Sequence, residues 1–250
     1  IAIVVWTAGM AVKKASQFRS LRRGLAPFLV AWTLLVLPIA LEPDFSTALL
    51  IGLLGLIIVF SAGARISHFI FLGLALAPIV YSQLVGVGFR LERLLAWLNP
   101  ASDPAGAGFQ AYQSLIAMGS GGIAGVGIGQ GRQRFGFLPE AHNDFIFSMI
   151  GEQWGLIGVL ILLTMYVALV LVGFRIASRA PDLFGELLAL GFTSLIALQA
   201  LLHMAVGLSL LPTTGLALPL VSYGRSNLIV TLASLGILMS VARMAPAARA

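Results

Sequence analysis

The sequence predicts an all-α integral membrane protein: a single transmembrane domain over residues 1–250, with about seven helical spans and one large extracytoplasmic loop. Three observations support this fold class. Of 250 residues, 59% are hydrophobic and 10% are charged, and the mean hydropathy is +1.02, which is far too apolar for a soluble domain. Apolar runs of spanning length alternate with short basic loops. Only residues 86–144 depart from this alternation, and they are assigned to the large loop.

The apolar runs define seven expected spans, which are 1–12, 25–41, 45–63, 69–85, 145–174, 187–210 and 227–241. The first is about half a span and starts without Met, so we expect an N-terminal part of the natural protein to be missing. Pro27 lies in the first turn of the second span, where its missing N–H costs little. Asp44 is the expected N-cap of the third span. Tyr112–Met118 is too short to cross a bilayer and is predicted to be re-entrant or interfacial.

The basic residues predict the orientation of the spans. Ten Lys and Arg residues fall on one side of the expected membrane and five on the other, and the richer side is expected to be cytoplasmic. This asymmetry accounts for the net charge of +6 and pI of 10.5 without nucleic acid binding. The chain has no cysteine, which excludes disulfides and thiol chemistry.

The stretch Gly136–Glu152 joins a polar loop to a long apolar helix. We expect Asn143 or Asp144 to be the N-cap of this helix, with Asp144, Ser148 and Glu152 on one face. Glu152 then lies about 12 Å along the helix from Asp144. An acid at that depth is a functional candidate, although a structural hydrogen bond to a neighbouring helix is an equal alternative. For Asp144 the alternative is a plain helix cap.

Further polar residues surround this junction. Glu140 and His142 precede Asp144, but no second histidine lies nearby, so a zinc-type site is not expected. Mg²⁺ or Mn²⁺ shared with a substrate phosphate stays open as a cofactor. The glycine-rich run 119–131 follows no predicted strand and lacks a Walker lysine, so we interpret it as a flexible, closely packed loop rather than a nucleotide cradle.

Five stretches, taken in order, resemble the SEDS family (shape, elongation, division and sporulation), which includes FtsW, RodA and SpoVE. They are 42–48 (EPDFSTA), 103–110 (DPAGAGFQ), 113–122 (QSLIAMGSGG), 136–147 (GFLPEAHNDFIF), and 211–215 (LPTTG) followed by 222–224 (SYG). The resemblance covers the whole chain, which corresponds to the last seven of the family's ten helices. The wording of 132–142 and 211–215 is most like that of the division-type members.

The resemblance implies a peptidoglycan glycosyltransferase of the bacterial inner membrane, with its active site on the extracytoplasmic side. It would polymerise lipid II, with undecaprenyl diphosphate as the leaving group, and work with a class B penicillin-binding transpeptidase and other division or elongation membrane proteins. The aspartate of the fourth stretch is the family's proposed catalytic residue, which makes Asp144 the expected general base.

Other residues receive expected roles around Asp144. Arg132 and Arg134, together with Arg90 or Arg93, are expected to hold the donor's diphosphate, with lipid-headgroup contact as the alternative. Glu140 and His142 are expected to contact substrate. The supporting residues are Glu152, Asp44, Pro212, Thr213, Ser222 and Tyr223.

The sequence departs from the family pattern at three places: Arg225-Ser-Asn227 stands where Gly-Ser-Ser is usual, Gln153 where a second Glu is usual, and Glu42 where Gln is usual. The alternative function is a flippase for the same lipid-linked sugar, because intramembrane acids such as Glu152 also suit a translocation path. A scaffold that only recruits partners is a third, weaker hypothesis. The clustering of polar candidates near Asp144 favours the transferase.

Overall fold

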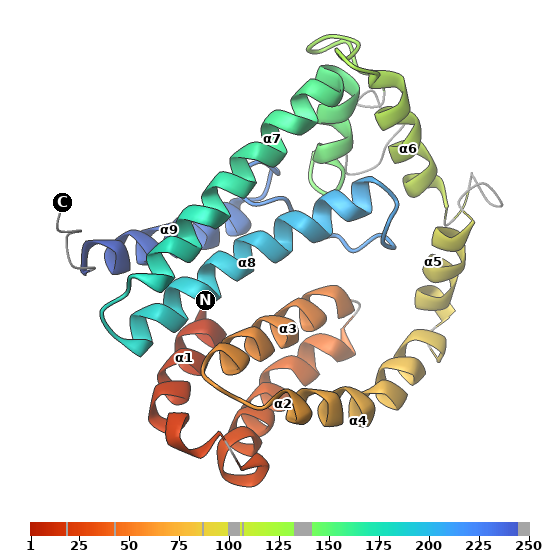
Figure 1. Cartoon of the computed structure of the whole chain (residues 1–250). Coiled ribbons are helices and arrows are strands. Elements are labelled where there is room, and N and C mark those ends of the chain that lie inside the picture. The colour runs from red at the N-terminus through yellow and green to blue at the C-terminus, as the bar shows by residue number, and fades with distance from the viewer. Residues whose placement is uncertain are drawn as a thin grey trace. The chain divides into compact units, whose positions relative to one another are not determined.

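The computed structural model describes residues 1–18, 20–42, 44–86, 88–99, 106, 108–132 and 142–244, and their regular elements are helices (Figure 1). Seven of these helices correspond to the predicted spans: α1 (Ala2–Lys14), α2 (Ala26–Leu41), α3 (Phe45–Ser61), α4 (Ile66–Val85), α7 (Ile146–Ser178), α8 (Leu183–Gly207) and α9 (Arg225–Met244). Within the described residues, four helical segments are long and apolar enough to cross a bilayer: Arg22–Ile39, α7, α8 and α9. Ser46–Ser61 and Ile66–Ser82 are shorter apolar helices. The all-helical membrane fold is therefore confirmed.

Two further helices lie within the stretch assigned to the large loop. α6 (Phe109–Gly121) contains the short piece Tyr112–Met118 and, at 13 residues, is too short to span a bilayer, as predicted. α5 (Gly88–Leu98) was not among the predicted helices. Its charged and apolar residues alternate with the helical period, which is typical of a helix with one face against protein and the other exposed.

Contacts group the chain into two compact units, which are described separately. Unit 1 consists of 1–74, 168–198 and 228–250, and unit 2 of 75–167 and 199–227. Unit 1 thus holds α1 to α3 and the starting residues of α8, whereas unit 2 holds α5, α6, the glycine-rich run and the segment between α8 and α9.

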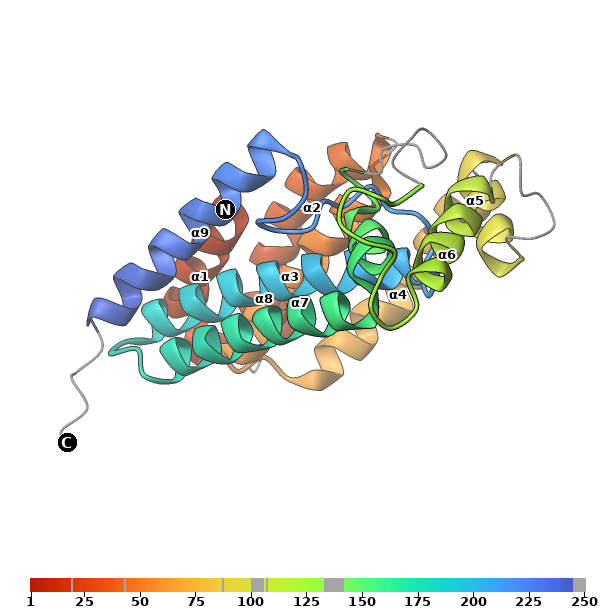
Figure 2. The ribbon, with the colours of Figure 1, turned by 90° about the horizontal axis from the view of Figure 1, so that it is seen from above.

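Unit 1 is built on close helix contacts. α1 and α2 both pack against α3 (Figure 1, Figure 2). Trp32 of α2 donates its indole N–H to Thr7 of α1 at 3.1 Å and stacks edge-on against Phe28. A Cβ at Gly55 would lie 2.7 Å from the Trp32 ring, so only glycine lets α3 approach this side chain. As predicted, Asp44 caps α3 by accepting the backbone N–H of Thr47 at 3.0 Å.

The predicted N-cap of α7 is wrong. The helix begins at Ile146, and the carbonyl of Phe145 accepts the first N–H groups, from Ser148 and Met149. Asp144 therefore lies one residue before the cap, in the turn 142–145. The reason is tertiary: the carbonyls of His142 and Asn143 are bound by the segment before α9, which holds this backbone out of the helix.

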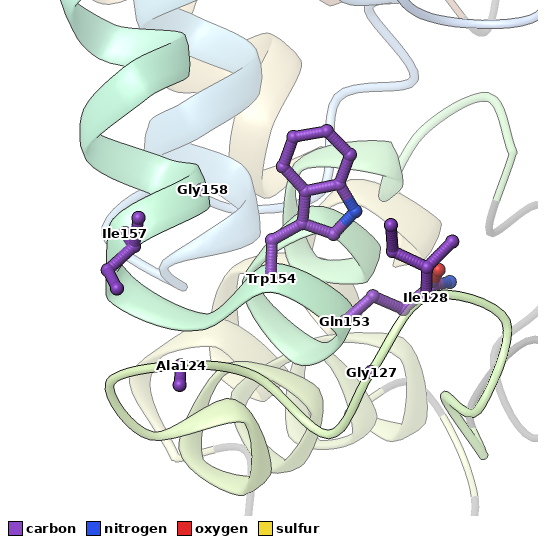
Figure 3. Close-up of a pocket in the computed structure, with 7 residues that line it drawn as sticks. All are labelled: Ala124, Gly127, Ile128, Gln153, Trp154, Ile157 and Gly158. Carbon is purple, nitrogen blue, oxygen red and sulfur yellow. The ribbon is translucent and has the colours of Figure 1, made fainter.

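The single continuous span predicted for 145–174 is also wrong, because α7 is broken at Gly155. This residue has φ +64° and ψ −159°. These angles are not helical, and glycine adopts them more readily than other residues do. Figure 3 shows the ribbon turning sharply between Trp154 and Ile157. α7 thus consists of a short piece, 146–154, and a long apolar piece, 156–178, which at 1.5 Å per residue is about 34 Å long. The short piece carries Ser148 and Glu152, and Asp144 immediately precedes it.

Candidate functional site

Asp144 faces the segment that connects α8 to α9. Its carboxylate is partly exposed, and a Cβ placed on Gly215 would lie 3.7 Å from Asp144 Oδ2. Gly215 has φ +70°, so the Pro-Thr-Thr-Gly segment turns in a left-handed conformation directly beside the carboxylate. The turn therefore brings backbone, with no side chain, up to Asp144, and leaves room for a substrate group there.

Arg93 supplies a positive charge to the same place. It projects from α5, and its guanidinium donates to the carbonyl of Thr213 at 3.5 Å. Partial burial lowers the pKa of Arg93, and the attraction of the nearby Asp144 carboxylate raises it in part. An arginine stays cationic at neutral pH under such opposing effects, so a fixed cation stands near the carboxylate.

Hydrogen bonds lock the backbone of the turn 142–145 to the segment before α9. Tyr223 donates its N–H to the carbonyl of His142 at 3.1 Å, and Ser222 Oγ donates to the carbonyl of Asn143 at 2.7 Å. The same Ser222 Oγ accepts the N–H of Leu218 at 2.8 Å. The two carbonyls directly before Asp144 are thus bound by Ser222 and Tyr223, so the position of Asp144 depends on the segment before α9.

Buried polar contacts support the site from beneath. The hydroxyl oxygens of Ser114 in α6 and Ser148 in α7 lie 2.6 Å apart, within hydrogen-bond distance. The Ser114 hydroxyl also donates to the carbonyl of Gly207 in α8 at 2.7 Å, so these contacts join three helices. Both serines are fully buried. Gly207 packs against Phe147 and Ser148 so closely that a Cβ would lie 2.9 Å from the Phe147 ring. These contacts fix the short piece of α7 that follows Asp144.

The segment 208–224 is anchored to three helices. Trp97 of α5 donates its indole N–H to the carbonyl of Ser209 at 2.9 Å. His203 of α8, which is buried, contacts the carbonyl of Leu216 through Nδ1 at 2.7 Å, so Nδ1 carries the hydrogen. The hydroxyl of Tyr166 in α7 donates to the carbonyl of Pro219. The residues facing Asp144 are thus held at several points.

The predicted site residues separate into groups. One group, which the structure brings together, consists of Asp144, Arg93, Thr213 and Ser222. Tyr223 and His142 contribute their backbone to this group, and the side chains of these two residues are exposed. Pro212 adjoins Thr213 and is partly buried. Asp44 belongs to unit 1, where its carboxylate caps α3. Arg90 lies on α5, and its side chain is not described; Arg134 and Glu140 lie outside the described residues.

Arg132 is not placed beside Asp144. Its N–H donates to the side chain of Glu152 at 2.8 Å, and Glu152 stands at the far end of the short piece 146–154. Glu152 lies eight positions after Asp144, a separation that corresponds to about 12 Å along a helix. Of the two arginines Arg93 and Arg132, whose side chains the structure describes, Arg93 is the one that it places near Asp144.

Several contacts were not predicted from the sequence: the Ser114–Ser148 pair, the Trp97 anchor and the close approach of Gly215. Each joins residues far apart in the chain. Within the part of the chain that the structure describes, no three His, Cys, Asp or Glu side chains lie together in a way that would hold a metal ion.

A hollow of about 280 Å³ lies at the break of α7, apart from these residues (Figure 3). It is lined by Ala124, Gly127, Ile128, Gln153, Trp154, Ile157 and Gly158. Its lining is mainly apolar and contains no acid or cation, so it lacks the groups that transfer chemistry requires.

Comparison with known proteins places these features in a family. Residues 1–246 match the cell cycle protein family FTSW_RODA_SPOVE. The chain belongs to this family. Similar relatives of the FtsW/RodA/SpoVE family include a probable peptidoglycan glycosyltransferase FtsW from Geobacter sulfurreducens, 43% identical over 241 residues, and stage V sporulation protein E from Bacillus subtilis, 40% identical over 243 residues. These alignments cover 96% and 97% of this chain but 65% and 66% of the relatives, so the chain spans less than two thirds of their length.

Two solved structures share the fold of this chain. A chain of a peptidoglycan synthase complex, studied for the coordination of polymerization and crosslinking, is 30% identical and superposes with a TM-score of 0.79, covering 96% of this chain and 67% of the other. The rod shape determining protein RodA of Thermus thermophilus is 28% identical with a TM-score of 0.61, covering 96% and 64%. The family assignment made from the five sequence stretches is confirmed, and this chain is a multi-pass membrane protein.

Proposed function

We propose that this chain is the catalytic part of a peptidoglycan glycosyltransferase that polymerises lipid II at the extracytoplasmic face of the bacterial inner membrane. The observation that carries the proposal is the position of Asp144, a carboxylate next to the Arg93 cation and the side-chain-free turn at Gly215. The FtsW relatives are probable peptidoglycan glycosyltransferases, which supports the same reaction.

The proposed reaction requires a base and a cation in this arrangement. Asp144 accepts the proton of an acceptor sugar hydroxyl while that oxygen bonds to the anomeric carbon of the donor. The bond from this carbon to the diphosphate oxygen breaks, and its electron pair leaves with the lipid diphosphate. A positioned carboxylate contributes about 10² to 10⁴ to the rate of such a transfer, and a nearby guanidinium stabilises the negative charge that grows on the leaving group.

Arg93 is the first candidate for the diphosphate, because it lies near Asp144 and its fork of N–H donors fits phosphate oxygens. Arg132 is the second, at the end of the short piece of α7. Arg134, Arg90 and Glu140 keep their predicted roles as proposals. Mg²⁺ or Mn²⁺ bound jointly by the diphosphate and a carboxylate is compatible with the reaction, and Asp144 is the acid in this site that would share it.

The distribution of charge supports the proposed orientation. The described basic residues that are predicted to be cytoplasmic, Lys13, Lys14, Arg22, Arg23, Arg65, Arg175, Arg179 and Arg243, all fall in unit 1. Those predicted to be outside, Arg90, Arg93, Arg132 and Arg225, all fall in unit 2 with Asp144. A site beside the arginines of unit 2 is thus expected to face away from the cytoplasm.

The flippase alternative relied on Glu152 as an intramembrane acid on a translocation path. The structure engages this carboxylate with the backbone of Arg132, which weakens that argument. As partner we propose a class B penicillin-binding transpeptidase. Its support is the similarity to a chain of a peptidoglycan synthase complex.

Purified full-length protein, supplied with fluorescent lipid II in detergent, tests the proposal. We expect glycan polymer, in larger amount when the transpeptidase is present. In a parallel assay, the protein is reconstituted into vesicles whose labelled lipid II is accessible to an external quencher only after translocation. Translocation without polymer would support the flippase in place of the transferase. If neither activity were observed, the scaffold hypothesis would be left.

A further inference from the structure

The glycine-rich run 119–131 lies beside the break in α7: its first three residues belong to α6 and are not loop, and the residues from 122 onward bind the backbone at the break. At a helix break the preceding carbonyls and the following N–H groups lose their helical partners. Here the carbonyls of Glu152 and Gln153 accept the N–H groups of Val126 and Gly127 at 3.0 and 3.1 Å. The N–H of Leu156 donates to the carbonyl of Gly122 at 2.9 Å, and that of Ile157 to the carbonyl of Ile123 at 3.2 Å. The close packing predicted for the glycine run is thus confirmed, and the packing is against α7.

Two side chains extend these contacts toward Arg132. Gln153 Oε1 accepts the N–H of Gly129 at 3.0 Å, and Glu152 Oε1 accepts the N–H of Arg132 at 2.8 Å. Glu152 is 2% exposed, and burying a carboxylate is costly unless it is hydrogen-bonded, so the contact with the Arg132 N–H offsets part of the cost of burial. A Cβ on Gly131 would lie 2.7 Å from Glu152 Oε2, so the backbone of the run rests directly on this carboxylate.

The short piece 146–154 therefore connects two groups of the proposed reaction. Asp144 immediately precedes its first turn, and the main chain of Arg132 is bound at its last turn. Arg132 itself is exposed, so its backbone is held while its guanidinium stays accessible to a ligand.

We propose that Glu152 is a positioning residue: by binding the N–H of Arg132, it holds this arginine at a fixed place relative to Asp144 and so sets the affinity for the donor diphosphate. This inference rests on the proposed function. It differs from both earlier interpretations of Glu152, a structural hydrogen bond to a neighbouring helix and a place on a translocation path, because the carboxylate binds the main chain of a residue proposed to hold substrate.

The test measures kcat and KM for lipid II with the full-length protein. Glu152→Ala should raise KM about tenfold, the size of effect that loss of a charge-assisted contact produces, with a smaller change in kcat. Glu152→Gln keeps an oxygen that accepts the Arg132 N–H and should stay within about threefold of wild type. Gln153→Ala, which removes the neighbouring tie to Gly129 only, should also stay within about threefold.

A double-variant cycle shows whether Glu152 acts through Arg132. Arg132→Gln alone should raise KM, and Glu152→Ala combined with Arg132→Gln should raise it no further. Additive effects, an unchanged KM in Glu152→Ala, or an equal rise in Gln153→Ala would each overturn the inference. If Glu152→Ala fails to fold, Gly131→Ala takes its place, because its methyl group displaces the same carboxylate; Gly119→Ala, which has open space around its Cβ, is the matched control.

Asp144→Asn is assayed alongside these variants. Polymerisation by Asp144→Asn would contradict the proposed function whatever the KM values are. An inactive Asp144→Asn together with a normal KM in Glu152→Ala would overturn only the positioning role.

Discussion

Asp144 Oδ2 lies beside Gly215: a Cβ added to Gly215 would be 3.7 Å from this oxygen. Gly215→Ala should therefore affect the site in two ways: it places a methyl group against the carboxylate and it strains a backbone with φ +70°, at about 1 kcal/mol. We expect polymerisation to fall about tenfold or more, because the methyl group occupies space beside the carboxylate where the acceptor must be positioned.

Gly63→Ala is the matched control for strain alone. Gly63 has φ +101°, nothing within 4 Å of its Cβ position, and lies in unit 1. It should lower thermal stability about as much as Gly215→Ala while leaving turnover near wild type. Equal loss of turnover in both variants would mean that Gly215 acts through stability.

Arg93 is predicted to act through its charge and its fork of donors. Arg93→Gln loses the charge near Asp144, and Arg93→Lys keeps a charge but not the planar geometry. We expect initial rates of lipid II polymerisation to fall in the order wild type, Lys, Gln, with the Gln variant reduced about tenfold or more. Arg65→Gln, an exposed arginine of unit 1, serves as the control and should keep the wild-type rate. A wild-type rate in Arg93→Gln would leave the diphosphate to Arg132 and Arg134.

The break in α7 predicts a large loss of stability for Gly155→Ala. The new Cβ would lie 2.4 Å from the N of Gly125 and 2.5 Å from the carbonyl oxygen of Ile123, both of which are backbone atoms that cannot rotate away. With φ +64°, the cost should exceed the roughly 1 kcal/mol of a strained alanine alone. Thermal unfolding in detergent measures this, with Gly73→Ala, which has open space in α4, expected to melt at or above the wild-type temperature. A wild-type melting temperature for Gly155→Ala would contradict the described break.

The absence of cysteine makes the predicted orientation easy to test. Ser178 and Ser226 are both exposed, and the first lies at the end of α7 and the second at the start of α9. Ser226→Cys should react with a membrane-impermeant maleimide in intact spheroplasts, whereas Ser178→Cys should react only after permeabilisation. The opposite pattern would place Asp144 on the cytoplasmic side and remove the transferase mechanism.

The sequence was sufficient to locate the seven helices that correspond to the predicted spans, because a long apolar run has few alternatives to a helix. It also gave Asp144 and Arg93 as candidate site residues, and the structure places these two near one another. The break at Gly155 escaped prediction because nothing in the local sequence distinguishes this glycine from Gly158, three residues later. Only the tertiary pairing of 122–127 with the exposed backbone of α7 shows which glycine interrupts the helix.

The start of α7 escaped prediction for a related reason. Asn143 and Asp144 have good capping side chains, so local preference places the cap there. The bonds from Ser222 and Tyr223 to this turn compete with the helix, and they come from residues about eighty positions away. Long-range hydrogen bonds thus decided both features, and local patterns do not contain them.

Asp144→Asn tests the central claim most directly. The variant preserves the size of the side chain and removes its ability to accept a proton, so the full-length protein should still express, melt near the wild-type temperature and bind lipid II. We expect the initial rate of lipid II polymerisation by the purified variant, with its transpeptidase present, to fall by about 10² or more. A folded Asp144→Asn protein that polymerises lipid II at the wild-type rate would contradict the assignment of Asp144 as the general base.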